Sequence, residues 1–197
     1  EDVSIGMGLD NRIGGRFLRA GPAYGGSCFP KDTRAILDTA FKFKTNLSLI
    51  KSVIKSNENR SKLLINRIFK LLNNNLKNKK ICFLGVTFKA NTDDMRESSS
   101  VKMIPKLSKK GAFINYYDPT GEKNEFKKIK NVQYKTSIKS ACENSDLIII
   151  HTEWNDFKSI NFKKFSKNKK LIIYDMRNIY SPAKIKAQGF KYFSVGR

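Results

Sequence analysis

The sequence is poor in the residues that build metal sites and disulfide frameworks. Its 197 residues include three cysteines, Cys28, Cys82 and Cys142, and one histidine. The cysteines are far apart, and no Cys-x-x-Cys pair or Cys/His cluster occurs. Their odd number and spacing exclude a disulfide-stapled secreted fold and argue against a zinc site. We therefore expect no metal, and reduced thiols in a cytoplasmic protein.

Long hydrophobic runs are also missing. No stretch of about 18 apolar residues appears, so we expect no membrane-spanning helix and no membrane partner. Residues 1–6 are acidic and lack an apolar run, so we expect no signal peptide. The sequence lacks an initial Met and starts in the middle of a pattern. We expect it to be a piece of a longer protein.

Acidic residues are scarce. The chain has 17 of them against 39 basic residues, a net charge of +22. Such a charge is compatible with nucleic-acid binding. However, the lysines are scattered among asparagines at turns and helix ends, as in residues 77–80 and 167–170. A compositional bias explains them better than a polyanion site, so we expect no nucleic-acid partner.

A dinucleotide-binding fingerprint is absent as well. No Gly-x-Gly-x-x-Gly follows an expected strand, and Gly85 stands alone after the first one. Even so, strands and helices alternate from residue 80 onward. Strands are expected at 80–86, 112–117, 132–134, 146–151, 171–175 and 190–195, and helices at 101–110, 137–143, 162–165 and 182–188. Nearly continuous apolar strands of this kind predict a doubly wound, Rossmann-like parallel sheet in an α/β fold.

The first part of the chain has a different character. Apolar residues recur near a period of 3.6 over residues 32–43 and 47–72, which predicts two helices. The second of these is polar over residues 55–60, and the pattern leaves open whether it packs on another subunit or on its own core. An Asn-rich break follows it. We predict a helical central region at 1–76 and a sheet domain at 77–197.

Charged side chains follow the ends of three predicted strands. Lys89 and Arg96 follow the first strand, Glu153 the fourth and Arg177 the fifth. Ligands of parallel α/β sheets bind beyond these ends. The cations suit a diphosphate, although solvated loop charges are the alternative.

A glycine-rich loop places one cysteine at the start of a helix. The run Gly-Gly-Ser-Cys-Phe-Pro-Lys-Asp covers residues 25–32, and Pro30 suits the first helical position. Unpaired N–H groups at a helix start, together with Lys31, favour a thiolate at Cys28. We therefore expect Cys28 to be a nucleophile.

This run closely resembles the catalytic loop of the UDP-glucose/GDP-mannose dehydrogenase family of nucleotide-sugar dehydrogenases. Further motifs of that family follow in order: Phe-Lys-Ala-Asn-Thr-Asp-Asp-Met-Arg-Glu-Ser at 88–98, Thr-Glu-Trp at 152–154 and Asp-Met-Arg-Asn at 175–178. The motifs are most similar to members that oxidise UDP-glucose at C6. Members that act on UDP-N-acetylmannosamine or GDP-mannose are the alternatives.

The resemblance implies an activity and a role for each matching residue. The activity is NAD-dependent oxidation of UDP-glucose to UDP-glucuronate, with Cys28 as nucleophile and Asp32 positioning water. A homodimer through the central helices is also implied. The substrate would meet Arg12 of the neighbouring subunit, Phe17, Tyr24, Gly25, Phe88, Lys89 and Arg177, and NAD would meet Ser27 and Arg96.

The resemblance covers only the carboxy-terminal part of such an enzyme. The family's amino-terminal NAD-binding domain has no counterpart in the sequence. By itself the chain would then be a module that binds a nucleotide-sugar and dimerises without oxidising it. The single histidine, His151, ends a predicted buried strand, where a packed role is favoured over a general base.

Overall fold

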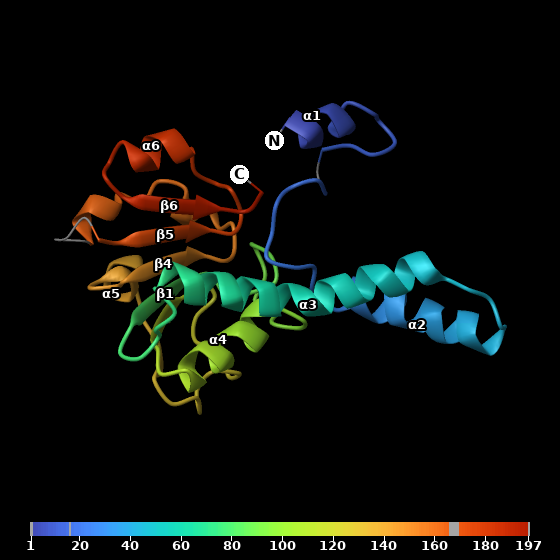
Figure 1. Cartoon of the computed structure of the whole chain (residues 1–197), viewed down its shortest axis with the longest axis horizontal. Coiled ribbons are helices and arrows are strands. Elements are labelled where there is room, and N and C mark those ends of the chain that lie inside the picture. Colours follow the sequence, from blue (N-terminus) through green and yellow to red (C-terminus); the bar gives the residue numbers. More distant parts are fainter. Residues whose placement is uncertain (1, 16, 166–169, 197) are drawn as a thin grey trace.

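A computed structural model describes residues 2–15, 17–165 and 170–196. Its centre is a parallel sheet in the order β3-β2-β1-β4-β5-β6. Figure 1 shows β1, β4, β5 and β6 side by side. This order confirms the predicted doubly wound sheet. The strands are β1 (Lys80–Leu84), β2 (Phe113–Tyr117), β3 (Val132–Tyr134), β4 (Leu147–Ile150), β5 (Ile172–Asp175) and β6 (Lys191–Ser194).

Both faces of the sheet are buried, as the continuous apolar strands require. Along β1, Ile81 and Phe83 join one hydrophobic core, while Cys82 and Leu84 join the other. The first core is completed by α3 (Ser48–Leu71) and α4 (Ser99–Lys109). The second is completed by α5 (Ile138–Cys142), α6 (Pro182–Lys186) and the 3₁₀ helices η1 (Asn155–Phe157) and η2 (Phe162–Lys164).

The long helix α3 belongs to two parts of the molecule. Its second half buries Leu64, Ile65 and Ile68 in the first core. Its first half runs beside α2 (Cys28–Lys42), and together they form an arm that extends away from the sheet (Figure 1). On this half Leu49 is 75% exposed. The helix therefore packs on its own core over half its length only.

The amino-terminal segment differs from the expectation in two places. An additional helix, α1 (Asp2–Gly8), precedes the cysteine loop. Helix α2 begins at Cys28, so that Pro30 is its third residue rather than its first. The N–H groups of the whole first turn lack intrahelical partners, so proline is tolerated there.

Candidate functional site

The loop before Cys28 is held by the polar middle of α3. The side chain of Asn57 accepts a hydrogen bond from the Tyr24 N–H (3.0 Å) and donates one to the Tyr24 carbonyl (3.1 Å). Arg60 donates to the carbonyls of Pro22 (3.2 Å) and Gly21 (3.4 Å). Sequence reasoning did not identify Asn57 or Arg60 as site residues. Their signal was the polar interruption of an otherwise amphipathic helix.

The other side of the loop lies against the segment that follows β1. The Gly26 N–H donates to the carbonyl of Arg96 (2.8 Å). A Cβ atom at Gly25 would lie 2.6 Å from the Glu97 carbonyl oxygen, so only glycine permits this approach. The cysteine loop is thus clamped between the arm and the sheet domain.

Cys28 is exposed at the start of α2, beside a cavity of about 600 Å³. The Oγ of Ser27 lies 3.6 Å from the Cys28 sulfur. The cavity brings together three residues predicted for the site, Ser27, Cys28 and Arg96. Its full lining is Gly26, Ser27, Cys28, Pro30, Lys31, Arg34, Arg96 and Glu97.

The cavity wall is cationic, and its guanidinium groups are paired. Arg34 lies 3.1 Å from Glu97, and this hydrogen bond holds the pKa of the Glu97 carboxyl below its usual value. Arg96 donates two hydrogen bonds to Asp94, of 2.9 and 2.8 Å, which lower the pKa of Asp94 in the same way. Both carboxylates stay ionised and fix the direction of the cations.

Phe88 and Lys89 meet the cysteine loop. A Cβ atom at Gly26 would lie 2.9 Å from the Phe88 ring, which therefore rests directly on this glycine. The Lys89 ammonium lies 5.3 Å from the centre of the same ring. Two residues predicted for the substrate thus adjoin the loop that carries Cys28.

The side chain of Arg177, which follows β5, links the segments that follow β4 and β1. Its Nε donates to the carbonyl of His151 (2.9 Å) and its Nη2 to the carbonyl of Phe88 (2.8 Å). The same Nε lies 2.8 Å from Oε2 of Glu153, and only 12% of the Arg177 side chain is exposed. Two members of the predicted crevice, Glu153 and Arg177, are thus paired with one another.

The remaining predicted residues lie outside the lining of the cavity. Asp32 is exposed one turn after Cys28, with an oxygen 3.4 Å from the Lys31 ammonium. Tyr24 packs edge-on against Phe29, with ring centres 4.8 Å apart. In the segment after α1, Arg12 pairs with Asp10 at 2.6 Å, and Phe17 is 87% exposed.

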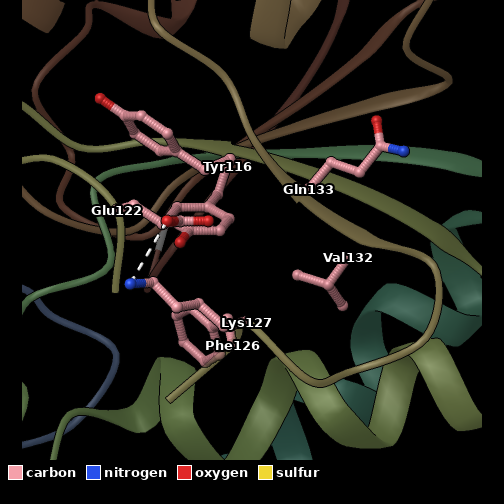
Figure 2. Close-up of a pocket in the computed structure, with 7 residues that line it drawn as sticks. Tyr116, Glu122, Phe126, Lys127, Val132 and Gln133 are labelled. Atoms are coloured by element: carbon pink, nitrogen blue, oxygen red, sulfur yellow. Dashed lines mark ion pairs between the residues drawn. The ribbon is translucent and has the colours of Figure 1, made fainter. Parts of the chain in front are cut away.

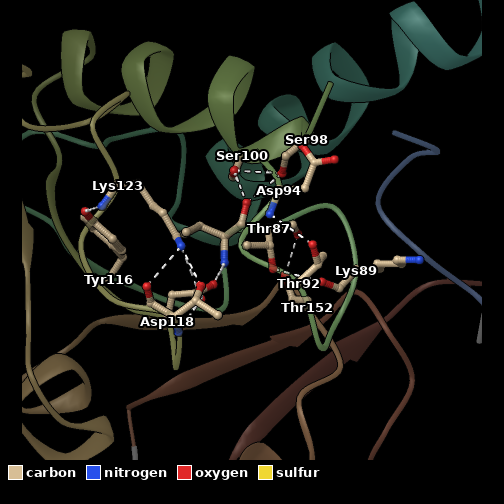
Figure 3. A network of polar contacts seen from close by, with 12 residues as sticks. Thr87, Lys89, Thr92, Asp94, Ser98, Ser100, Tyr116, Asp118, Lys123 and Thr152 are labelled. Atoms are coloured by element: carbon tan, nitrogen blue, oxygen red, sulfur yellow. Dashed lines mark hydrogen bonds and ion pairs between the residues drawn. The ribbon is translucent and has the colours of Figure 1, made fainter. Parts of the chain in front are cut away.

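A buried polar network anchors the first residues after β1 (Figure 3). The Val86 N–H donates to Asp118 (2.8 Å), whose carboxylate lies 3.8 Å from the Lys123 ammonium. The Val86 carbonyl accepts hydrogen bonds from the hydroxyls of Ser98 and Ser100. This network joins the ends of β1 and β2 to the start of α4.

A second, smaller cavity lies where β2 and β3 meet the loop that connects them (Figure 2). It measures about 270 Å³, and Glu122 and Lys127 form an ion pair of 3.6 Å beside it. No residue predicted for the site lines it. The lining consists of Tyr116, Glu122, Phe126, Lys127, Val132, Gln133 and Tyr134.

Three other residues occupy the places predicted for them. Cys82 and Cys142 are buried, with their sulfurs 3.7 Å apart, which confirms that they are core residues. His151 is fully buried, which confirms the packed interpretation. Within residues 2–15, 17–165 and 170–196, no three His, Cys, Asp or Glu side chains gather as metal ligands, and no helix is long and apolar enough to cross a membrane.

Comparison with known proteins assigns both parts of the chain to one family. Residues 82–182 match the UDP binding domain of the UDP-glucose/GDP-mannose dehydrogenase family, and residues 1–59 match its central domain. UDP-glucose 6-dehydrogenases of Rickettsia typhi and Rhizobium meliloti are 42% and 39% identical over the whole chain. The chain spans 46% and 45% of their lengths.

Solved structures of the same family also superpose on this chain. A UDP-glucose dehydrogenase from Pyrobaculum islandicum superposes with a TM-score of 0.79 at 27% identity, over 98% of this chain and 42% of that one. A UDP-D-ManNAc dehydrogenase from Pyrococcus horikoshii superposes with a TM-score of 0.78 at 26% identity, over 100% of this chain and 44% of that one. With its cysteine loop, its sheet order and these matches over its whole length, the chain belongs to the UDP-glucose/GDP-mannose dehydrogenase family.

Proposed function

We propose that the chain is the carboxy-terminal part of an NAD-dependent UDP-glucose 6-dehydrogenase. Such an enzyme oxidises C6 of UDP-glucose to the carboxylate of UDP-glucuronate. One observation carries the proposal. The exposed thiol of Cys28 lies beside a cavity, and the loop before Cys28 packs against Phe88, which belongs to the segment that matches the UDP binding domain.

The substrate would lie across this junction. The Lys89 ammonium and the Phe88 ring would meet the UDP part, and Arg177 would support them. The sugar would extend toward Cys28 past Tyr24, Gly25 and Phe17, with Arg12 supplied by a second subunit.

NAD, when bound, would accept the two hydrides that leave the sugar C6, one in each of two successive oxidations. The cavity beside Cys28 fits a pyrophosphate-bearing cofactor, because Lys31, Arg34 and Arg96 line it and the Arg96 side chain is 69% exposed. Ser27 and Arg96 are the residues that would hold it from this chain.

Cys28 supplies the covalent chemistry. Its sulfur adds to the C6 aldehyde and holds it as a thiohemiacetal, which the second oxidation converts into a thioester. Water, positioned by Asp32, then hydrolyses the thioester and releases the carboxylate. Sulfur suits both steps because the thioester it forms is still open to hydrolysis.

The assembly is part of the same proposal. Residues 1–76 would form the central region, residues 77–197 would form the UDP-sugar domain, and the exposed face of the central helices would join two subunits in the cytoplasm. The chain covers less than half of its curated relatives. The alternative is therefore a UDP-sugar-binding, dimerising module that has no activity by itself.

Calorimetry on the 197-residue chain tests the nucleotide. UDP should bind more tightly than GDP, and Lys89→Ala should weaken UDP binding about tenfold through loss of a charged contact. Lys184→Ala, at an exposed lysine on α6, is the charge-matched control and should have no effect. Tighter binding of GDP would point to a GDP-mannose dehydrogenase instead.

Turnover in the full-length protein tests the chemistry. Cys28→Ser should abolish uronate formation while UDP-glucose still binds, since only the covalent step is lost. Normal uronate production by this variant would refute the assignment. UDP binding without NADH formation by the 197-residue chain alone would support the inactive-module alternative for this piece.

A further inference from the structure

A line of buried hydrogen bonds runs from α4 through β4 to the segment after β1. The Oγ of Ser99 lies 2.8 Å from Nε2 of His151, and Nδ1 of His151 lies 3.1 Å from Oγ1 of Thr152. The Thr152 hydroxyl donates to the carbonyl of Thr87 (2.8 Å). All four side chains are buried, and three of them have no exposed surface.

The direction of each bond follows from the hydrogens available. A carbonyl only accepts, so the single hydroxyl hydrogen of Thr152 goes to Thr87. Thr152 must then accept from His151, which requires a hydrogen on Nδ1. In the uncharged ring Nε2 is left as an acceptor, and the Ser99 hydroxyl donates to it.

The surroundings keep the ring uncharged. Burial, and after it the positive charge of Arg177, lowers the pKa of His151 to about 3. Two carboxylates lie near Arg177, and both are engaged: Glu153 is paired with Arg177, and Asp175 accepts hydrogen bonds from the Arg177 N–H and the Tyr192 hydroxyl. The Phe83 ring lies 6.3 Å from the imidazole ring and offers no charge.

Thr152 itself has no freedom to turn away. A Cβ atom at Gly85 would lie only 2.5 Å from the Cβ of Thr152, so the two residues are in direct contact. Gly85 has a φ of 75°, in the left-handed region that favours glycine. The position of the Thr152 hydroxyl is therefore set by packing, and the donor at Nδ1 of His151 leaves its hydrogen for the Thr87 carbonyl.

The line ends on a segment whose three carbonyls are all engaged. The Thr87 carbonyl accepts from Thr152, the Phe88 carbonyl from Arg177, and the Lys89 carbonyl from the Thr87 hydroxyl (2.9 Å). Thr87, Lys89 and Thr152 lie together in Figure 3. The backbone of residues 87–89 is thus fixed while the Lys89 side chain extends outward.

We propose that His151, as the Nδ1–H tautomer, is a positioning residue that fixes residues 87–89 for the nucleotide. The inference rests on the proposed function, because it assumes that Phe88 and Lys89 bind UDP. His151 acts through Thr152 and touches no ligand itself.

Two substitutions distinguish the roles of the two ring nitrogens of His151. The side-chain nitrogen of Asn occupies the place of Nδ1, so His151→Asn keeps a donor for Thr152 and loses the partner of Ser99. Gln instead reaches the place of Nε2, so His151→Gln keeps the Ser99 contact and loses the donor to Thr152. In calorimetry on the 197-residue chain, the Asn variant should bind UDP within about threefold of wild type, and the Gln variant at least tenfold more weakly. Equal affinities of the two variants at equal melting temperatures would overturn the proposal.

The tautomer can be measured without any ligand. The chain has one histidine, so ¹⁵N imidazole NMR yields a single pair of ring signals. A proton on Nδ1 supports the proposal, and a proton on Nε2 refutes it even if neither variant folds. If wild type fails to bind UDP while the Nδ1–H tautomer is seen, the proposed function fails and the hydrogen-bond line stands.

Discussion

His151 and Cys28 are two reactive residue types placed in opposite surroundings. Cys28 is exposed beside a cationic cavity, whereas His151 is enclosed and its ring nitrogens are both engaged. A nucleophile must reach its substrate, whereas a buried polar group must be hydrogen-bonded. Accessibility therefore favours the proposed nucleophilic role for Cys28 and a structural role for His151.

The buried imidazole makes stability depend on pH. The pKa of His151 is about 3 in the folded chain and about 6.5 in an unfolded one. As pH falls below 6.5 the unfolded state takes up the proton first, so the free energy of unfolding falls, by about 2 kcal/mol from this group at pH 5. Above pH 6.5 the imidazole is mostly uncharged in both states, so protonation of this group no longer lowers the free energy of unfolding.

Urea unfolding at pH 7 and pH 5 measures this loss. His151→Asn has no imidazole to protonate, so its decrease between the two pH values should be about 2 kcal/mol smaller than that of wild type. An equal decrease in both proteins would show that the histidine does not contribute. The carboxylates are common to both chains and cancel in the comparison.

Helix α3 combines a packing half with a half that serves the site. Its polar middle, residues 55–60, places Asn57 and Arg60 on the cysteine loop. The two hydrogen bonds of Asn57 satisfy both backbone groups of Tyr24. Removing them leaves a half-buried peptide unit without these partners.

Asn57→Ala should therefore lower the free energy of unfolding by about 1–3 kcal/mol and increase proteolysis within residues 21–26. Asn66→Ala is the matched control, because Asn66 is exposed on the same helix. Its stability should be unchanged or slightly raised, as alanine favours helices. Denaturant unfolding and limited proteolysis measure both effects, and equal behaviour of the two variants would contradict the clamp.

The helices and strands could be predicted from the sequence because their hydrophobic patterns are visible in it. The parallel sheet follows from runs such as Leu-Ile-Ile-Ile at β4, which are buried on both faces. Tertiary pairings carry no such local signal. The link from Asn57 to Tyr24 spans 33 positions, and that from Phe88 to Arg177 spans 89, so neither could be predicted from spacing.

The candidate site could be predicted in part for the same reason. The cysteine loop was found because its glycines and helix start lie together in the sequence, and the cavity brings Ser27, Cys28 and Arg96 together. From the sequence, Arg177 and Glu153 are two separate charges that follow the ends of predicted strands. In the fold they form one ion pair, since adjacent strands bring their ends side by side.

Across the whole molecule, the arm leaves apolar surface without cover. Phe41, Phe43 and Leu49, where α2 passes into α3, are each more than 70% exposed. Several large apolar side chains exposed at one end of an arm favour an interface. It supports the proposed dimer through the central helices.

Sedimentation of the chain at micromolar concentration should therefore show a dimer. Leu49→Lys should shift it to monomer, because a charge in the interface would be buried without a partner. Phe113→Lys, at a 45% exposed position at the start of β2, is the control and should leave the dimer intact. A monomeric wild-type chain, or an equal effect of both substitutions, would contradict the assignment of the arm.

The engaged carbonyls of residues 87–89 have a consequence for selectivity. Each of these oxygens already accepts one hydrogen bond from the protein, which leaves each of them one lone pair for a ligand's hydroxyl groups. The stretch also offers the ammonium of Lys89, a donor with no accepting capacity. We therefore expect the junction to favour ligands that bring oxygen acceptors, as phosphates do, and we expect the sugar hydroxyls to be recognised at the cysteine loop.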